Sequence, residues 1–255
     1  MAAEDTNKDL VISYLTMRKA VGWLGMLLPF ILLFGNKFIN SLDVLNSNWV
    51  VLKDCYDPYT AASSFKSSIS HYYYSTVGEL FTGTLCAVAL FMFCYKGHKK
   101  RKGEKGLSDS AMTNLAGFFA LGVVIFPTSS DFCITDSIRT FLSSSITGNI
   151  HYSFAALFFI TLAVMSMVNF RRSANIKDFG KGKYDYLYLW FGMGMICCLV
   201  LIGAYKIIKH YTNAFDFLHP VFCLEAVALI CFGLSWLKKG KVDIKYVPRM
   251  LKLID

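Results

Sequence analysis

The chain has 255 residues, of which 55% are hydrophobic and only 17% are charged, and it carries a formal net charge of +9. Its apolar residues lie in continuous blocks and not in periodic stripes, a pattern typical of a polytopic membrane protein. Basic runs such as 96–102 and 238–241 follow the apolar blocks directly. Runs in that position act as topology determinants near lipid headgroups, so the positive charge does not indicate a nucleic-acid partner.

Six apolar blocks each predict a helix that spans the membrane, because a helix needs about 20 residues to cross roughly 30 Å of hydrocarbon. These predicted spans cover residues 20–39, 77–96, 112–128, 150–170, 186–207 and 219–237. No long Pro-rich or Gly/Ser-rich linker divides the chain. The sequence therefore predicts one domain over residues 1–255, an all-α polytopic bundle of six transmembrane helices.

The distribution of basic residues predicts the orientation of this bundle. Six of the 26 Lys and Arg fall in the segments 37–76, 129–149 and 206–218, which leaves 20 for the opposite side. By the positive-inside rule, both termini are expected in the cytoplasm, in a multi-pass protein of the cell membrane. The first span lacks a small-residue cleavage site and is expected to remain as an anchor.

Glu225 stands in the middle of the apolar run 221–232, which holds no other charge. An ionisable group at membrane depth costs at least a few kcal/mol to insert, so it is expected to have a partner, a polar cavity or a function. Other polar residues fall near the outer ends of the predicted spans. The candidate ligand-binding residues are Ser70, Tyr72, Tyr73, Glu79, His151, His219 and Glu225. Together they predict a polar pocket that opens toward the outer leaflet.

Several chemistries fit this set of residues, and the sequence leaves them open. Ser70, His151 and Glu225 could act as nucleophile, base and carboxylate of a membrane-embedded hydrolase or transferase, although no Gly-x-Ser-x-Gly elbow is present. Glu225 and His151 could instead form a relay in a transporter or channel. A structural pair that fixes helix packing is the third reading.

No metal centre and no cofactor are expected. The sequence has no His-x-x-x-His pair, and His219 and Glu225 are six residues apart. On one helix that spacing points two side chains about 120° away from each other.

Two cysteines, Cys55 and Cys133, fall in the predicted outer loops, whereas the other six lie in predicted spans. On an oxidising side of the membrane, Cys55 and Cys133 could form a disulfide. Spacing alone leaves their pairing open.

An ordered series of short motifs resembles a known group of proteins. The series comprises Ser68-Ile69-Ser70 with Tyr72-Tyr73, Phe81-x-Gly83-x-Leu85-Cys86, Tyr95-Lys96-Gly97, Phe126-Pro127-Thr128, His151-x-x-Phe154-Ala155 and Glu225-x-x-Ala228-Leu229. Over residues 68–241 the chain resembles the uncharacterised bacterial six-span proteins of the domain-of-unknown-function 998 class, which are similar in layout to the DRAM and Frag-like membrane proteins. The resemblance implies a six-span fold and marks Ser70, Tyr72, Tyr73, His151 and Glu225 as functional. The chain departs from the group at Gly78-Glu79, where the resemblance leads us to expect an Arg followed by Asn or Asp.

From these observations we expect an integral membrane protein that binds a lipid or another amphipathic ligand in a polar pocket at the outer leaflet. Modification of that ligand is the wider form of the same hypothesis. The hydrolase or transferase and the transporter or channel remain the alternatives. Membrane lipid is the expected partner, and the sequence assigns no oligomeric state.

Overall fold

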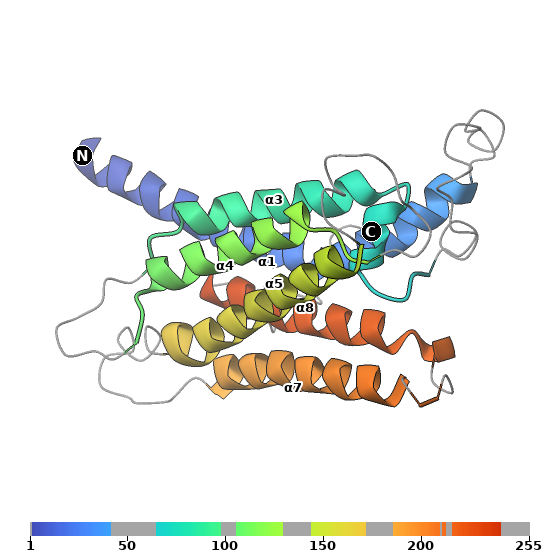
Figure 1. The fold of residues 1–255 in the computed structure, drawn as a ribbon. Helices are drawn as coiled ribbons and strands as arrows, with labels where there is room; N and C mark the ends of the chain where they lie inside the picture. Colours follow the sequence, from blue (N-terminus) through green and yellow to red (C-terminus); the bar gives the residue numbers. More distant parts are fainter. Residues whose placement is uncertain are drawn as a thin grey trace.

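A computed structural model describes residues 2–41, 65–97, 106–129, 144–171, 186–209, 211–212 and 216–240. Within these ranges the protein is all-α and contains six α-helices (Figure 1). They are α1 (Ala2–Ser41), α3 (Gly78–Cys94), α4 (Asp109–Ile125), α5 (Ser144–Val164), α7 (Tyr186–Lys209) and α8 (Pro220–Lys239). Three short elements accompany them: the 3₁₀ turns η3 (Ser70–Tyr74) and η6 (Asp216–Leu218), and the π-helical turn η5 (Met165–Phe170) that continues α5. The predicted all-α class is confirmed, and each of the six helices falls on one of the six predicted blocks.

Four of these helices are long and apolar enough to cross a bilayer: the segments Leu15–Ile39, Ser145–Phe170, Tyr186–Lys209 and Asp216–Lys239. Helices α3 and α4 are also apolar but have 17 residues each, which is about 25 Å at 1.5 Å per residue. Four long apolar helices indicate a multi-pass membrane protein.

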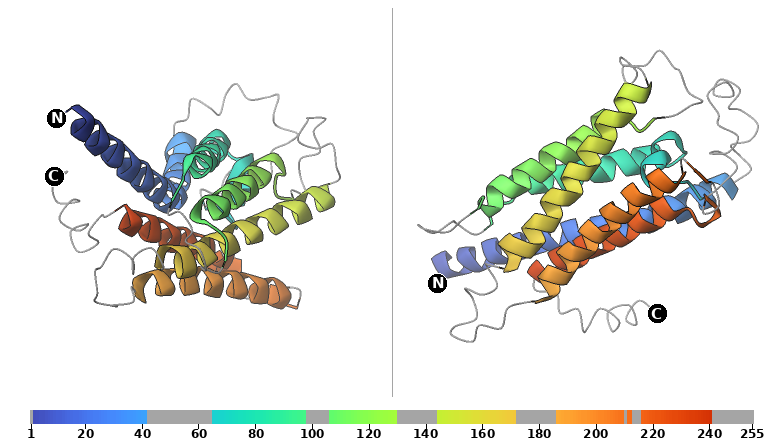
Figure 2. Two further views of the ribbon diagram at one scale, coloured as in Figure 1. Left: turned by 90° about the vertical axis from the view of Figure 1, so that its left-hand side faces the viewer. Right: turned by 60° about the horizontal axis from the view of Figure 1, so that its bottom comes forward.

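The helices lie side by side along roughly one direction, with α3 and α4 on one side of the bundle and α7 on the opposite side (Figures 1 and 2). Helix α8 packs against both α1 and α7, and α4 packs against both α3 and α5. Helices α3, α5 and α8 begin at the end of the bundle where α1, α4 and α7 finish. We call this end the Ser70 end, and the opposite one the Asp109 end.

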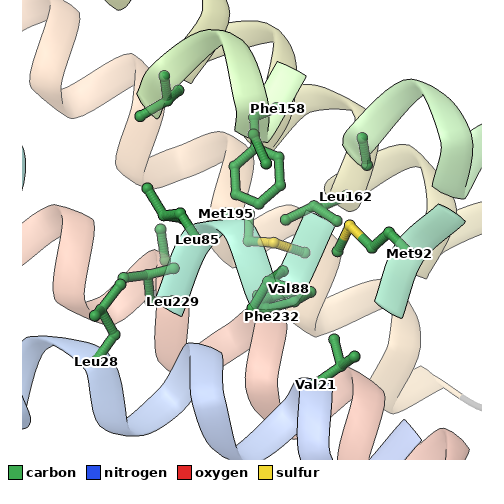
Figure 3. Packing of buried hydrophobic residues seen from close by; sticks show 14 of the residues in the cluster. Val21, Leu28, Leu85, Val88, Met92, Phe158, Leu162, Met195, Leu229 and Phe232 are labelled. Atoms are coloured by element: carbon green, nitrogen blue, oxygen red, sulfur yellow. The ribbon is translucent and has the colours of Figure 1, made fainter. Parts of the chain in front are cut away.

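Large apolar side chains fill the space between the helices (Figure 3). Val21 from α1, Val88 from α3, Phe158 from α5, Met195 from α7 and Phe232 from α8 are all buried and belong to one continuous cluster. Because helices from both halves of the chain contribute to it, the bundle is held together as one body.

The outside of the bundle is also apolar. Phe34 of α1 and Leu90 of α3 are each 62% exposed, Phe118 of α4 is 55% exposed and Val200 of α7 is 64% exposed. Large apolar side chains on several outward faces are costly in water and favourable in hydrocarbon. The outer faces of α3 and α4 therefore resemble those of the longer helices, although α3 and α4 are shorter.

Helices α1 and α8 approach each other closely at two glycines. A Cβ atom at Gly22 would lie 2.9 Å from the carbonyl oxygen of Gly233, and a Cβ atom at Gly233 would lie 2.6 Å from the carbonyl oxygen of Gly22. Small residues at such a crossing let two helix backbones meet, which is a common way of packing helices in membranes. This contact fixes the position of α8, the helix that carries Glu225.

A buried polar group closes the Asp109 end. The Asn169 side-chain amide donates to the Leu107 carbonyl at 3.1 Å and to Asp109 Oδ1 at 2.9 Å. Asp109 and Asn169 are both buried. These bonds hold the start of α4 to the π-helical turn η5 and satisfy polar groups that would otherwise be costly.

Candidate functional site

The segment from Phe65 to Thr76, which we call the cap segment, lies over the Ser70 end of the bundle. Its backbone is held to the first turn of α8, because the Phe222 amide donates to the Ser67 carbonyl at 3.1 Å. The Phe65 ring packs against Phe222, with centroids 4.7 Å apart. Tyr74 donates to the Thr128 carbonyl at 2.6 Å, just beyond the end of α4. The cap segment therefore joins helices that are distant in sequence.

Ser70 and His151 form a hydrogen-bonded pair between the cap segment and α5. The distance from Ser70 Oγ to His151 Nε2 is 2.8 Å, and His151 Nδ1 lies 2.7 Å from the Phe126 carbonyl oxygen. A carbonyl only accepts, so Nδ1 carries the hydrogen, and in the neutral imidazole Nε2 accepts from the Ser70 hydroxyl. Both residues are buried, with His151 1% exposed.

Glu225 binds the residue next to Ser70. Its Oε2 accepts a hydrogen bond from the Ile69 amide at 2.7 Å. Among the described residues, no hydrogen bond reaches the other carboxylate oxygen, Oε1. The carboxylate thus holds the cap segment with one oxygen and keeps the other available.

Ser70 and Glu225 line one small cavity of about 40 Å³ between α1, α3, α4, α5 and α8. The rest of its wall is apolar apart from the Ile69 backbone and consists of Leu28, Ile69, Phe81, Leu85, Val123, Ala155, Phe158, Phe159 and Leu229. A cavity that holds benzene measures about 150 Å³, so this one has room for a single small group. Its polar wall is the Glu225 and Ser70 side, and the opposite wall is hydrocarbon.

The two predicted tyrosines lie behind this wall and do not line the cavity. Tyr72 is fully buried and packs against Phe222, with ring centroids 6.0 Å apart, and Tyr73 packs against Tyr74 at 5.1 Å. Burial raises the pKa of the Tyr72 phenol to about 12, partly opposed by its hydrogen bond with the Lys66 backbone. Tyr72 therefore stays neutral and supports the cap segment by packing.

Two other predicted site residues lie apart from the cavity. Glu79 is exposed in the first turn of α3. His219 precedes α8 in the left-handed backbone region, with φ 45°, and its ring packs against Phe65 at 4.8 Å. Of the seven predicted residues, only Ser70 and Glu225 line the cavity, and His151 contacts Ser70 without lining it. The predicted disulfide partners Cys55 and Cys133 lie outside the described residues.

Lys206 is a charged residue of this region that sequence reasoning assigned only to orientation. Its ammonium lies 3.3 Å from the centroid of the Tyr152 ring, next to His151 in α5. The Tyr152 hydroxyl accepts from Thr128 Oγ1 at 3.2 Å. The sequence does show that Lys206 lies in the last turn of an apolar helix, α7. Its contact with Tyr152 could not be predicted, because Tyr152 belongs to α5. Over the described residues, no group of three His, Cys, Asp or Glu side chains could hold a metal ion.

No family model, curated protein or solved structure matches this chain. The resemblance to the bacterial six-span group stays a prediction. Function is therefore inferred from the geometry of the Ser70 end.

Proposed function

We propose that this protein binds a lipid or another amphipathic molecule at the Ser70 end of the bundle. The observation that carries the proposal is the cavity in which Glu225 and Ser70 face an apolar wall. A carboxylate oxygen without a hydrogen-bond partner is expensive inside a bundle surrounded by hydrocarbon. A bound polar group supplies that partner, while its apolar part packs against residues such as Phe81 and Phe158.

The size of the cavity limits which part of the ligand enters it. About 40 Å³ accommodates one small polar group with a few neighbouring atoms, not a whole lipid molecule. The remaining hydrocarbon of the ligand then lies along the apolar outer faces of the helices, where the bilayer itself supplies such molecules. Membrane lipid is therefore the ligand class that fits best.

A variant that fills the cavity tests this proposal. Ala155 lines the cavity from α5, whereas the next residue, Ala156, does not. Ala155→Leu is expected to reduce the amount of lipid that copurifies with the protein in detergent, and Ala156→Leu is expected to leave it unchanged. Mass spectrometry of extracted lipids measures both. Equal lipid content in the wild type and the two variants would contradict binding in this cavity.

We further infer that all six helices cross the membrane and that both termini face the cytoplasm. The apolar outer faces of α3 and α4 support six spans, and the 20 to 6 distribution of basic residues supports the orientation. The predicted pocket then faces the outer leaflet, because the Ser70 end is the end poor in basic residues.

Cysteine labelling tests this orientation. Leu107 and Tyr211 are exposed residues at opposite ends of the bundle, with exposed fractions of 54% and 82%. In a protein whose native cysteines are replaced, Leu107→Cys should react with a membrane-impermeant maleimide only after permeabilisation. Tyr211→Cys should react in intact cells. Equal reactivity of the two positions would overturn the orientation.

The polar side chains at the Asp109 end do not support the transporter alternative. A proton or ion relay needs polar groups that lead from Glu225 toward that end. In the part of the chain that the structure describes, Ser166 Oγ donates to the Tyr188 carbonyl at 2.8 Å and Asn169 binds Leu107 and Asp109. These polar side chains are used for packing the helix ends.

A further inference from the structure

We propose that Ser70 is a nucleophile and His151 its general base, and that the pair cleaves an acyl ester of the amphipathic ligand. This inference rests on the proposed function, since it needs the ligand's polar group in the cavity. A nucleophile and its base must lie within about 2.6–3.2 Å of each other, and a third group must orient the base. Ser70 and His151 are 2.8 Å apart, and the Phe126 carbonyl fixes the imidazole.

The tautomer of His151 is the one that the reaction requires. Because Nδ1–H donates to the Phe126 carbonyl, the lone pair of Nε2 points at the Ser70 hydroxyl. A carboxylate orients the imidazole in the best-known serine hydrolases, and a backbone carbonyl performs the same orientation here without a negative charge. A hydrogen bond that only held the cap segment to α5 would have the same geometry. It would not require that a ligand can reach Ser70.

The second observation that supports the reaction is that Ser70 can be reached from the cavity. Ser70 lines the cavity, whereas His151 lies behind it and does not. A group in the cavity therefore meets the serine first, and His151 Nε2 lies 2.8 Å behind the serine oxygen. Glu225 is a positioning residue in this arrangement, because it holds the amide of the preceding residue, Ile69, at 2.7 Å.

The chemistry balances with water as the second reactant. Ser70 Oγ bonds to the ester carbonyl carbon while its proton moves to His151 Nε2. The bond from that carbon to the ester's alkoxy oxygen breaks, and the departing alcohol takes the proton from the imidazolium. Water, deprotonated by His151, then attacks the carbonyl carbon of the acyl-serine. The bond from that carbon to Ser70 Oγ breaks, the imidazolium returns its proton to Ser70 Oγ, and a carboxylic acid is released. An ester group with its nearest carbons matches the small cavity, and its long chains remain in the bilayer.

A fluorophosphonate probe tests the proposal, because it reacts irreversibly with activated serines. The full-length protein in detergent micelles is incubated with an alkyl fluorophosphonate, and the modified residue is located by peptide mass spectrometry. We expect an adduct on Ser70 that is lost on heat denaturation before labelling. His151→Gln is expected to slow labelling by roughly 100-fold, the low end for loss of a general base. Ser153→Ala, an exposed serine two residues further along α5, is the matched control and should react like the wild type.

Several outcomes would overturn the reaction. They are an unmodified Ser70 in the folded wild type, equal labelling of native and denatured protein, or a wild-type rate in His151→Gln. Labelling of Ser70 in the wild-type protein tests the reaction even if a variant fails to fold. A thermal unfolding measurement identifies a variant that does not fold. If lipid copurifies but Ser70 forms no adduct, the proposed reaction is wrong and the proposed lipid binding stands. If Ser70 forms an adduct but no lipid copurifies, the proposal that the ligand is a membrane lipid is contradicted.

Discussion

Replacing Glu225 by leucine is expected to lower the free energy of unfolding by roughly 1 to 3 kcal/mol, because the buried Ile69 amide loses its acceptor. Glu225→Gln keeps a carbonyl oxygen at nearly the same position and should retain most of this stability. Thermal or denaturant unfolding of the two variants in the same detergent measures the difference. Copurifying lipid should fall in both, since both remove the carboxyl group from the cavity wall.

The comparison between the two variants separates binding from structure. A Gln variant with normal stability and reduced lipid content assigns the carboxyl group to ligand binding. A Gln variant that retains the wild-type lipid content would contradict a binding role for the carboxyl group and leave Glu225 as a support for the cap segment. His219→Gln provides a control at the same end of the bundle, because His219 packs against Phe65 outside the cavity.

Replacing Gly233 by leucine is expected to have the largest effect on the fold. Even the first side-chain atom would lie 2.6 Å from the Gly22 carbonyl oxygen and 2.6 Å from Met26 Cβ, so α1 and α8 must move apart. Overpacking of this kind costs roughly 1 to 3 kcal/mol, and more where backbone atoms clash. The melting temperature in detergent and the yield of monodisperse protein measure the loss.

Gly203→Leu is the matched control for that experiment. Gly203 lies in α7, and a Cβ atom built on it meets no atom within 4 Å. Its replacement should leave the melting temperature almost unchanged or raise it slightly, because leucine favours a helix more than glycine does. If Gly233→Leu and Gly203→Leu have the same stability, the close crossing of α1 and α8 does not exist in the folded protein.

The positions of the helices could be predicted from the sequence because they depend on local composition. A block such as 186–207 is apolar over enough residues to satisfy its own backbone as a helix, and the structure has α7 at Tyr186–Lys209. Helix ends follow local signals as well: Ser108 caps α4 by accepting from the Ala111 amide at 3.1 Å, and Pro220 opens α8. Charge asymmetry is equally local, and the orientation inferred from it stays a prediction.

The grouping of the site residues could be predicted only in part. Glu225 was distinguishable because it is an ionisable residue in the middle of an apolar block, whereas His151 lies at the start of its block, as Glu79 and His219 do. Glu79, His219, Tyr72 and Tyr73 carry the same polar chemistry near the same level of the bundle, yet none of them lines the cavity. Depth along a helix can be read from the sequence, but the direction in which a residue faces depends on how the helices pack.

The sequence by itself determined the all-α class, the apolar blocks and the isolated carboxylate of Glu225, since each is a property of neighbouring residues. Only the tertiary structure decided that Ser70 meets His151 across 81 positions and that Ile69 meets Glu225 across 156. Both contacts are made by the cap segment, which reaches α5 through Ser70 and α8 through Ile69. Packing of distant segments is selected by shape and by the need to satisfy buried polar groups, and neither leaves a local pattern.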